Sequence, residues 1–166
     1  MSYNLLKDFN SSKQYRLNVA VPESLYDHYR GLDHKQVSTR DFAKFVTPYP
    51  LKPIAERLWD IYSNAEDFAN GVLMIVHQIP YSATPLAKYP IETIVENIGD
   101  CDLFSYVAAS IMKAGELDVV LLYYDDEDHM NIGVHLPNPP QHARTSIYYV
   151  TYNGVRYYIA ECTGGN

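Results

Sequence analysis

Three residues that lie far apart in the sequence have the side chains needed for thiol-based acyl transfer: Cys101, His129 and Glu161. Cys101 follows Gly99 and Asp100 at the start of a predicted helix. At that position the unpaired amide N–H groups and the positive end of the helix dipole favour the thiolate, the form that attacks a carbonyl carbon. The same amides could hold an oxyanion. Cys101 is therefore the candidate nucleophile.

His129 begins a predicted strand over residues 129–136, and alternation along that strand places Asn131 and His135 on the same face. A histidine base needs access to the nucleophile and a partner for its second ring nitrogen. Glu161 offers that partner, because it closes the last predicted strand as a single carboxylate after an apolar run. Asn131 and His135 are candidates to line the same cleft.

Each of these residues also has an ordinary structural explanation. A free cysteine near a helix start is usually a small buried hydrophobe, and His129 or Glu161 alone fits a solvated strand end. Cys162 should point to the opposite face of its strand from Glu161, so we expect it to be structural. Four other histidines have no comparable context and are expected to be surface groups: His28, His34, His77 and His142.

Hydrophobic periodicity and turn signals predict the elements that must position these residues. Helices are predicted from Pro53, over 65–79 and over 101–113, and strands over 15–21, 118–124, 129–136, 146–152 and 155–162. Asn153-Gly154 joins the last two strands as a hairpin turn. Helices followed by a run of strands with short turns predict an α+β fold with an antiparallel sheet. We expect residues 1–50 to be an N-terminal extension packed on a core of residues 51–166, forming one compact domain.

Composition excludes several classes of function. The chain has 166 residues, of which 47% are hydrophobic, so it can form one core. Its net charge of −7 and scattered basic residues exclude nucleic acid as the main partner. No apolar run long enough for a membrane span and no signal peptide is present, so we expect no membrane contact from this segment. The compartment stays open, with the cytoplasm as default, and the chain could be a domain of a longer protein. The oligomeric state is also open.

The strongest charge run is acidic and covers residues 125–128. It fits a solvated turn between two strands, and a cation site is the alternative, although the run lacks the ligand spacing of a calcium loop. Sixteen tyrosines, several in adjacent pairs, fit either ordinary strand positions or an aromatic platform for a sugar or peptide.

The segments GDCDLFSYVAASIMKAGELDVVLLYY, DHMNIGV and VRYYIAECT together resemble the core of the transglutaminase-like superfamily, of the archaeal or bacterial type. That family has a Gly-Asp/Glu-Cys turn opening a helix, a His opening a strand and an acidic residue closing a later strand. The resemblance covers Tyr81 to Thr163, about half the chain. It implies a papain-like core in which helices pack on an antiparallel sheet, with a catalytic Cys at a helix N-terminus. In most members the acid is Asp followed by Pro-Thr, whereas here it is Glu161 followed by Cys162 and Thr163.

The resemblance also implies roles for individual residues. Cys101 would be the nucleophile that forms a thioester, His129 the general base and then acid, and Glu161 the group that orients His129. Gln78 is a candidate donor for the oxyanion hole, unless its amide caps its own helix. The substrate would be a peptide or protein amide. We expect hydrolysis, as in a cysteine peptidase or amidase, rather than cross-linking by an acyltransferase, since water needs no acceptor site. No cofactor and no metal is implied.

Two alternatives remain open. One is a non-catalytic module that retains the fold and binds a protein or peptide, because fold alone does not establish activity. The other is a metal hydrolase that uses His129 with the carboxylates of residues 125–128.

Overall fold

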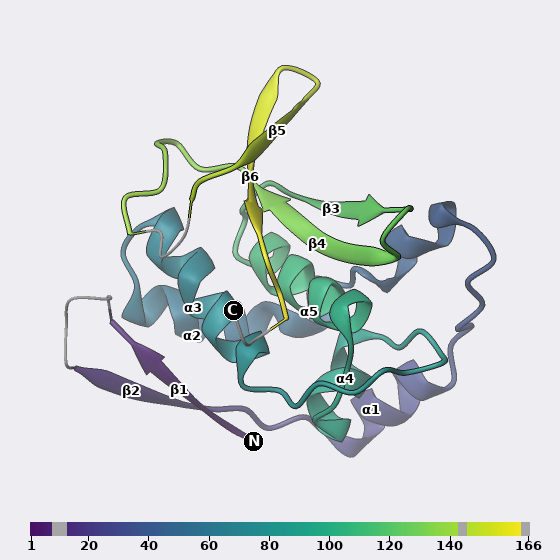
Figure 1. Ribbon diagram of the computed structural model, residues 1–166. Helices are drawn as coiled ribbons and strands as arrows, with labels where there is room; N and C mark the ends of the chain where they lie inside the picture. Colours follow the sequence, from purple (N-terminus) through teal and green to yellow (C-terminus); the bar gives the residue numbers. More distant parts are fainter. Residues whose placement is uncertain (8–12, 143–145, 164–166) are drawn as a thin grey trace.

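The computed structural model describes residues 1–7, 13–142 and 146–163, and over these ranges it is an α+β protein (Figure 1). Strands β3, β4, β6 and β5 form one antiparallel sheet in that order, and β1 and β2 form a separate hairpin. The predicted fold class, with helices and antiparallel sheets, is confirmed. The elements run in the order β1 (Ser2–Leu6), β2 (Gln14–Asn18), α1 (Glu23–Arg30), η1 (Thr39–Phe45), η2 (Tyr49–Leu51), α2 (Lys52–Ile61), α3 (Ala65–His77), α4 (Pro90–Glu96), α5 (Cys101–Ala114), β3 (Val119–Tyr124), β4 (His129–Val134), β5 (Tyr149–Tyr152) and β6 (Val155–Ala160).

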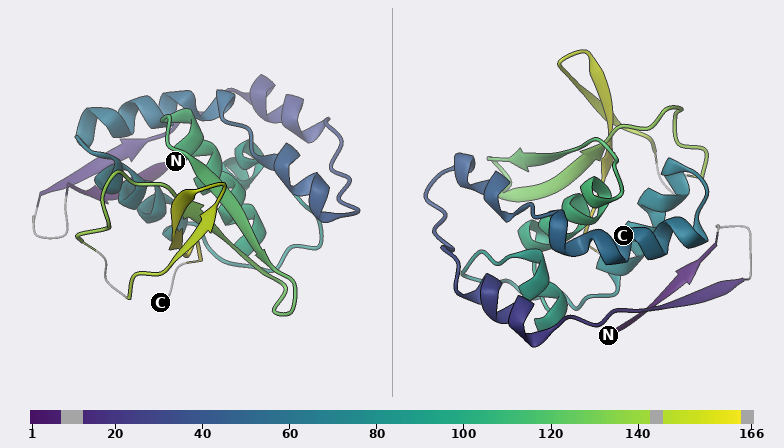
Figure 2. Two further views of the ribbon diagram at one scale, coloured as in Figure 1. Left: turned by 90° about the horizontal axis from the view of Figure 1, so that it is seen from above. Right: turned by 180° about the vertical axis from the view of Figure 1, so that it is seen from behind.

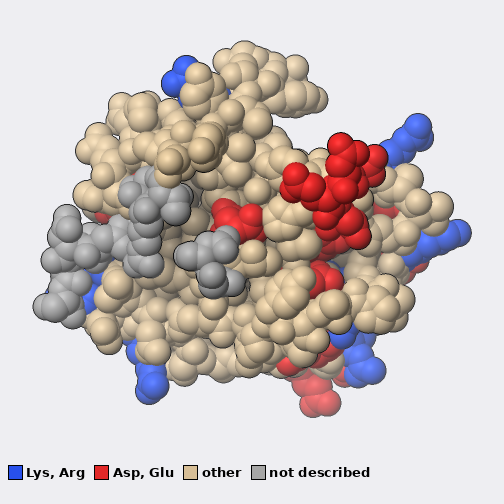
Figure 3. Space-filling model, viewed as in Figure 1, with Lys and Arg blue, Asp and Glu red and all other residues tan. Residues whose placement is uncertain are grey.

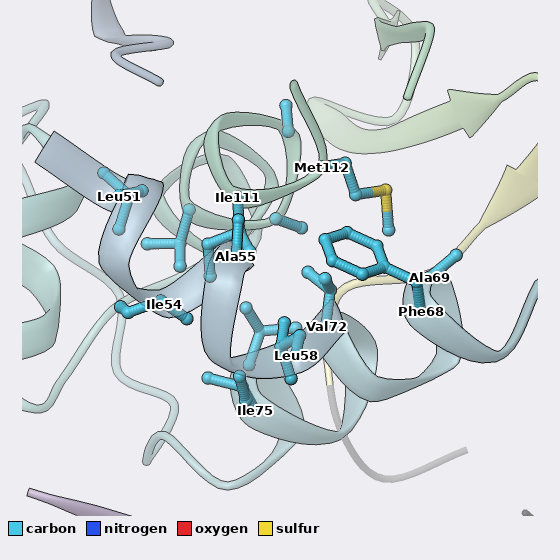
Figure 4. Packing of buried hydrophobic residues seen from close by; sticks show 14 of the residues in the cluster. Leu51, Ile54, Ala55, Leu58, Phe68, Ala69, Val72, Ile75, Ile111 and Met112 are labelled. Carbon is cyan, nitrogen blue, oxygen red and sulfur yellow. The ribbon is translucent and has the colours of Figure 1, made fainter. Parts of the chain in front are cut away.

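Helix α5 is the centre of the packing. Every residue from Leu103 to Met112 is buried, because β3 and β4 lie over one side of the helix and α2 and α3 lie along another (Figures 1 and 2). Phe68 and Val72 of α3 point toward Ile111 and Met112 of α5 in this core (Figure 4). A helix that is apolar on nearly all sides is held from several directions at once, so the position of its first residue is fixed.

The N-terminus of α5 is capped by a side chain. Asp100 is the N-cap, and one carboxylate oxygen accepts a hydrogen bond from Leu103 N over 3.3 Å. The other oxygen accepts from the backbone and hydroxyl of Thr84, at 3.1 and 2.8 Å. Asp100 therefore ties the preceding loop to the helix start, and Cys101 is the first helical residue.

The last two strands form the predicted hairpin, which projects from the body of the protein (Figures 1 and 2). Asn153 and Gly154 have φ angles of 50° and 76°, the left-handed values that this two-residue turn requires. Strand β6 then pairs with β4, with Ile132 opposite Ala160. This register places Glu161 immediately beyond the end of β6, next to the first half of β4.

The N-terminal part contains the largest differences from the prediction. The strand expected over 15–21 is β2, and its partner β1 and helix α1 were not predicted. Helix α1 buries none of its residues completely, and it packs on the core through the partly buried Leu25, Tyr26 and Tyr29. The hairpin packs on the core: Leu5 and Leu17 belong to the same buried cluster as Leu58, and the Tyr62 hydroxyl donates to Leu6 O over 2.6 Å.

Within the described ranges, no helix has the length and apolarity needed to cross a membrane.

Candidate active site

His129 and Glu161 are brought together at the edge of the sheet. Nε2 of His129 donates to Oε2 of Glu161 over 2.8 Å. The other carboxylate oxygen accepts hydrogen bonds from the backbone N–H groups of Cys162 and Thr163 and from the Thr163 hydroxyl, at 3.2, 3.3 and 3.0 Å. Burial works to raise the pKa of Glu161, but the hydrogen bonds from His129 and Thr163 outweigh it and hold that pKa below its ordinary value. Glu161 is therefore an ionised and well-oriented partner for the imidazole.

The imidazole of His129 is held at Nε2, and among the described residues nothing bonds its other nitrogen. Tyr124 is its cross-strand neighbour, and the two rings stack with centroids 6.0 Å apart and planes at 26°. A carboxylate can only accept, so Nε2 carries a proton and Nδ1 carries the lone pair in the neutral ring. Nδ1 has no hydrogen-bond partner among the described residues. The free nitrogen is the one that a base would use.

Cys101 lies next to the start of β4 and is partly buried. Its thiol donates to Oδ1 of Asp102 over 3.4 Å, and a backbone hydrogen bond from Met130, the residue after His129, reaches the sulfur. Within the part of the chain that the structure describes, no hydrogen bond joins Sγ to the His129 ring. The structure thus places the predicted nucleophile beside the His129 backbone, with the thiol turned toward Asp102.

The surroundings of Cys101 shift the pKa of its thiol upward. Burial raises the pKa of the thiol, the charges of Asp102 and Asp100 raise it further, and the backbone of Met130 partly opposes them; the net value is about 11. The helix start favours the thiolate, as expected from the sequence, but desolvation and the two flanking carboxylates favour the neutral thiol.

A buried serine connects the start of α5 to β4, the strand that begins with His129. Ser105 Oγ lies 2.8 Å from Cys101 O and 3.3 Å from Met130 O, and Ser105 is fully buried. Cys162 is also fully buried, and burial raises the pKa of its thiol strongly. This agrees with a structural role for Cys162.

The amide of Gln78, the predicted oxyanion donor, is engaged elsewhere. Oε1 accepts from Asn4 N over 2.9 Å, and Nε2 donates to Asn4 O and Met74 O, both over 2.8 Å. Gln78 is the C-terminal cap residue of α3, and its side chain joins β1 to the end of that helix by hydrogen bonds. Both amide hydrogens have acceptors, so this conformation leaves none for a substrate.

Asn131 and His135, the two predicted cleft residues, lie in different places. Asn131 is 7% exposed, and its Oδ1 has no hydrogen-bond partner within the ranges that the structure describes; it lies two residues along β4 from His129. His135 is exposed beyond the far end of β4, where Nδ1 bonds Arg156 O over 3.0 Å. Only Asn131 stays near the His129–Glu161 pair.

Two of the histidines expected to be ordinary surface groups have specific partners. Nε2 of His77, which is exposed at the end of α3, lies 3.0 Å from the backbone oxygen of Glu161. His34 is half-buried, and Nε2 lies 2.5 Å from Oε1 of Glu92, a carboxylate that α4 buries almost completely. The expectation was therefore wrong for His34, because the loop before η1 folds back onto α4.

The acidic run forms the turn between β3 and β4, and its four residues are exposed. Acidic side chains gather over this turn in Figure 3. Oδ1 of Asp128 accepts a hydrogen bond from the Tyr123 hydroxyl over 3.1 Å. Among the residues with described placement, no group of three His, Cys, Asp or Glu side chains is arranged to hold a metal ion.

Sequence reasoning missed four residues of the site: Tyr81, Asp102, Ser105 and Thr163. Asp102 and Thr163 are close in sequence to Cys101 and Glu161, and Ser105 lies one helical turn after Cys101. These spacings are signals that could have identified all three. Tyr81 is twenty residues before Cys101, and only the structure brings it near, through a backbone bridge to Gly99.

Comparisons of the chain with protein-family models, with curated proteins and with solved structures found no match.

Proposed function

We propose that the chain is a papain-like cysteine hydrolase of the transglutaminase-like type, which cleaves amides of peptides or proteins through a thioester on Cys101. The observation that carries the proposal is the 2.8 Å contact between His129 Nε2 and Glu161 Oε2, made beside a helix that begins with Cys101. A nucleophile at a helix start, a base and an oriented carboxylate are the parts that covalent acyl transfer needs.

His129 is the general base because its free nitrogen, Nδ1, carries the lone pair. The thiol of Cys101 is neutral at rest, since its pKa is about 11. The proton therefore leaves Sγ for Nδ1 as the sulfur attacks the substrate carbonyl. The imidazolium that forms is stabilised by Glu161 across Nε2.

The reaction proceeds in two halves. The Sγ–C bond forms while the C=O electron pair moves onto oxygen; the pair then returns, the C–N bond breaks, and His129 gives its proton to the leaving amine. This leaves a thioester. Water, deprotonated by His129, attacks the thioester, and the acid product leaves as Cys101 recovers its proton. Hydrolysis is favoured because water needs no acceptor site of its own.

A non-catalytic protein- or peptide-binding module is the second candidate. The observation that favours it is the raised pKa of Cys101 together with the thiol's orientation toward Asp102. In that case the His129–Glu161 contact would serve only to fasten the end of β6 to β4.

The two candidates are separated by comparing wild type with Cys101→Ala on a defined peptide library, with new N-termini and deamidated side chains detected by mass spectrometry. Catalysis predicts products with wild type only, and loss of those products after treatment with iodoacetamide. Peptides that are retained but not cut by both proteins would support the binding module. Equal products from both proteins would exclude Cys101 as the nucleophile.

A further inference from the structure

The proposed reaction places a negative charge on the substrate oxygen, so the site needs donors for that oxygen. The first two amides of a helix have no intrahelical acceptor. The N–H groups of Cys101 and Asp102 are therefore available, since Asp100 caps Leu103 N instead. Gln78 adds nothing in this conformation, because both of its amide hydrogens are engaged. A side-chain donor must come from another residue.

Tyr81 is fixed beside the helix start by its backbone and its ring. It forms an isolated parallel bridge with Gly99, and the flanking hydrogen bonds are Ser82 N to Gly99 O, 2.8 Å, and Gly99 N to Pro80 O, 3.2 Å. Its ring packs edge-on against Phe104 of α5, with centroids 6.2 Å apart at 70°. The bridge lies two residues before Cys101, so the backbone of Tyr81 is held close to the start of α5, and its ring contacts that helix at Phe104.

The hydroxyl of Tyr81 keeps its proton and donates it to no other residue that the structure describes. Burial, and to a smaller extent the carboxylates of Asp100 and Asp102, raises its pKa above the ordinary value. Its hydroxyl donates to no other described residue, although most ordered hydroxyls find a partner. The residue is 60% exposed, so a substrate can reach it.

We propose that Tyr81 is a catalytic residue of the Cys101 site, whose hydroxyl donates a hydrogen bond to the oxyanion formed when Sγ adds to the substrate carbonyl. The role rests on the proposed function. The hydroxyl gives the third donor beside the amides of Cys101 and Asp102, and it keeps its own proton throughout the reaction. The bond strengthens as charge develops on the oxygen, so it lowers the barrier more than it tightens binding.

Two reactions of the same thiol test this role, because only one of them passes through an oxyanion. Acylation of Cys101 by p-nitrophenyl acetate forms a tetrahedral oxyanion, whereas alkylation by iodoacetamide displaces iodide directly. Both adducts are measured by intact mass over time in wild type, Tyr81→Phe and Tyr49→Phe. Tyr49 is 80% exposed at the start of η2 and is the matched control.

Tyr81→Phe is expected to slow acylation by about 10- to 1,000-fold, the cost of removing one oxyanion donor, with no change in alkylation. Tyr49→Phe should leave both rates unchanged. Equal acylation of Tyr81→Phe and wild type overturns the role, and so does an equal fall in both rates, which would mean that Tyr81 acts on the thiol itself. Failure of wild type to be acylated at Cys101 overturns the proposed function, and with it this role.

Discussion

The carboxylate of Glu161 holds the His129 ring at Nε2 over 2.8 Å, and no residue of the described ranges bonds Nδ1. The carboxylate is in turn held by the backbone of Cys162 and by Thr163. The contact is thus set by the last strand and by the two residues after it, and it fixes the tautomer of the base.

Glu161→Gln should lower Cys101-dependent turnover by about 100-fold or more, because an amide can offer its N–H to Nε2 and favour the wrong tautomer of His129. The kcat should fall more than the KM changes, since orientation of the base matters in the transition state. The measurement is steady-state hydrolysis of a peptide amide found with the library above. An unchanged kcat would mean that Glu161 only fastens the strand end.

The same variant should also change the dependence of stability on pH. The pKa of Glu161 is lower in the folded protein than the ordinary value of 4.5. Its contribution to stability is therefore fully present above that value and is lost as the pH falls through the lower folded-state pKa. Thermal unfolding measured from neutral pH to well below 4.5 should show a shallower acid loss in Glu161→Gln than in wild type. Glu56→Gln, an exposed change on α2, should keep the wild-type profile.

Asp102→Asn should make Cys101 more reactive toward iodoacetamide at mildly alkaline pH. The Asp102 charge and its hydrogen bond with the thiol both raise the pKa of Cys101, so removing the charge should lower that pKa from about 11. Burial is the larger cause and persists in the variant, so the pKa should fall only in part. The pH profile of alkylation measures the shift.

The matched control is Asp60→Asn, an exposed change on α2, which should not move the alkylation profile. Cys162 gives an internal reference within each protein, because it is fully buried and should react far more slowly than Cys101. Slower alkylation in Asp102→Asn would contradict the assignment of Asp102 as a group that holds the thiol neutral.

The meeting of His129 and Glu161 could be expected from the sequence, because it depends on strand order and on a hairpin turn with a clear local signal. The charge state of Cys101 could not, since it depends on how deeply α5 is covered and on carboxylates whose orientation only packing decides. The partners of Gln78 could not be predicted from the sequence either. Its place shortly before the Cys101 loop suggested catalysis, but its partner is Asn4, in a strand that the sequence did not reveal.

Gln78→Ala should lower the stability of the fold without changing the reactivity of Cys101. It removes two hydrogen bonds between α3 and β1 and one within the end of α3, and a net loss of about 1 kcal/mol for each bond is typical, with less at an exposed site. We expect a lower thermal midpoint and an unchanged rate of Cys101 acylation by p-nitrophenyl acetate. A large loss of acylation in a folded Gln78→Ala protein would contradict this prediction and would support Gln78 as an oxyanion donor.

Gly99 is the residue whose lack of a side chain lets the Tyr81 segment lie against the start of α5. A Cβ at this position would lie 2.9 Å from a ring carbon of Phe104 and 3.2 Å from Leu103 Cβ. Both of those residues are fully buried and cannot move freely. An alanine would therefore push the loop away from the helix or displace the Phe104 ring on which Tyr81 packs.

Gly99→Ala should destabilise the protein by about 1–3 kcal/mol, the usual cost of overpacking a buried site, and should slow Cys101 acylation by p-nitrophenyl acetate. Gly31→Ala is the control: a Cβ there meets only two backbone oxygens at 3.6 Å, which is ordinary contact, and the change should be neutral or slightly stabilising. Urea unfolding and acylation rates are measured for both variants. Unchanged acylation in Gly99→Ala would mean that the position of Tyr81 does not matter to the nucleophile, which would count against the role assigned to its hydroxyl.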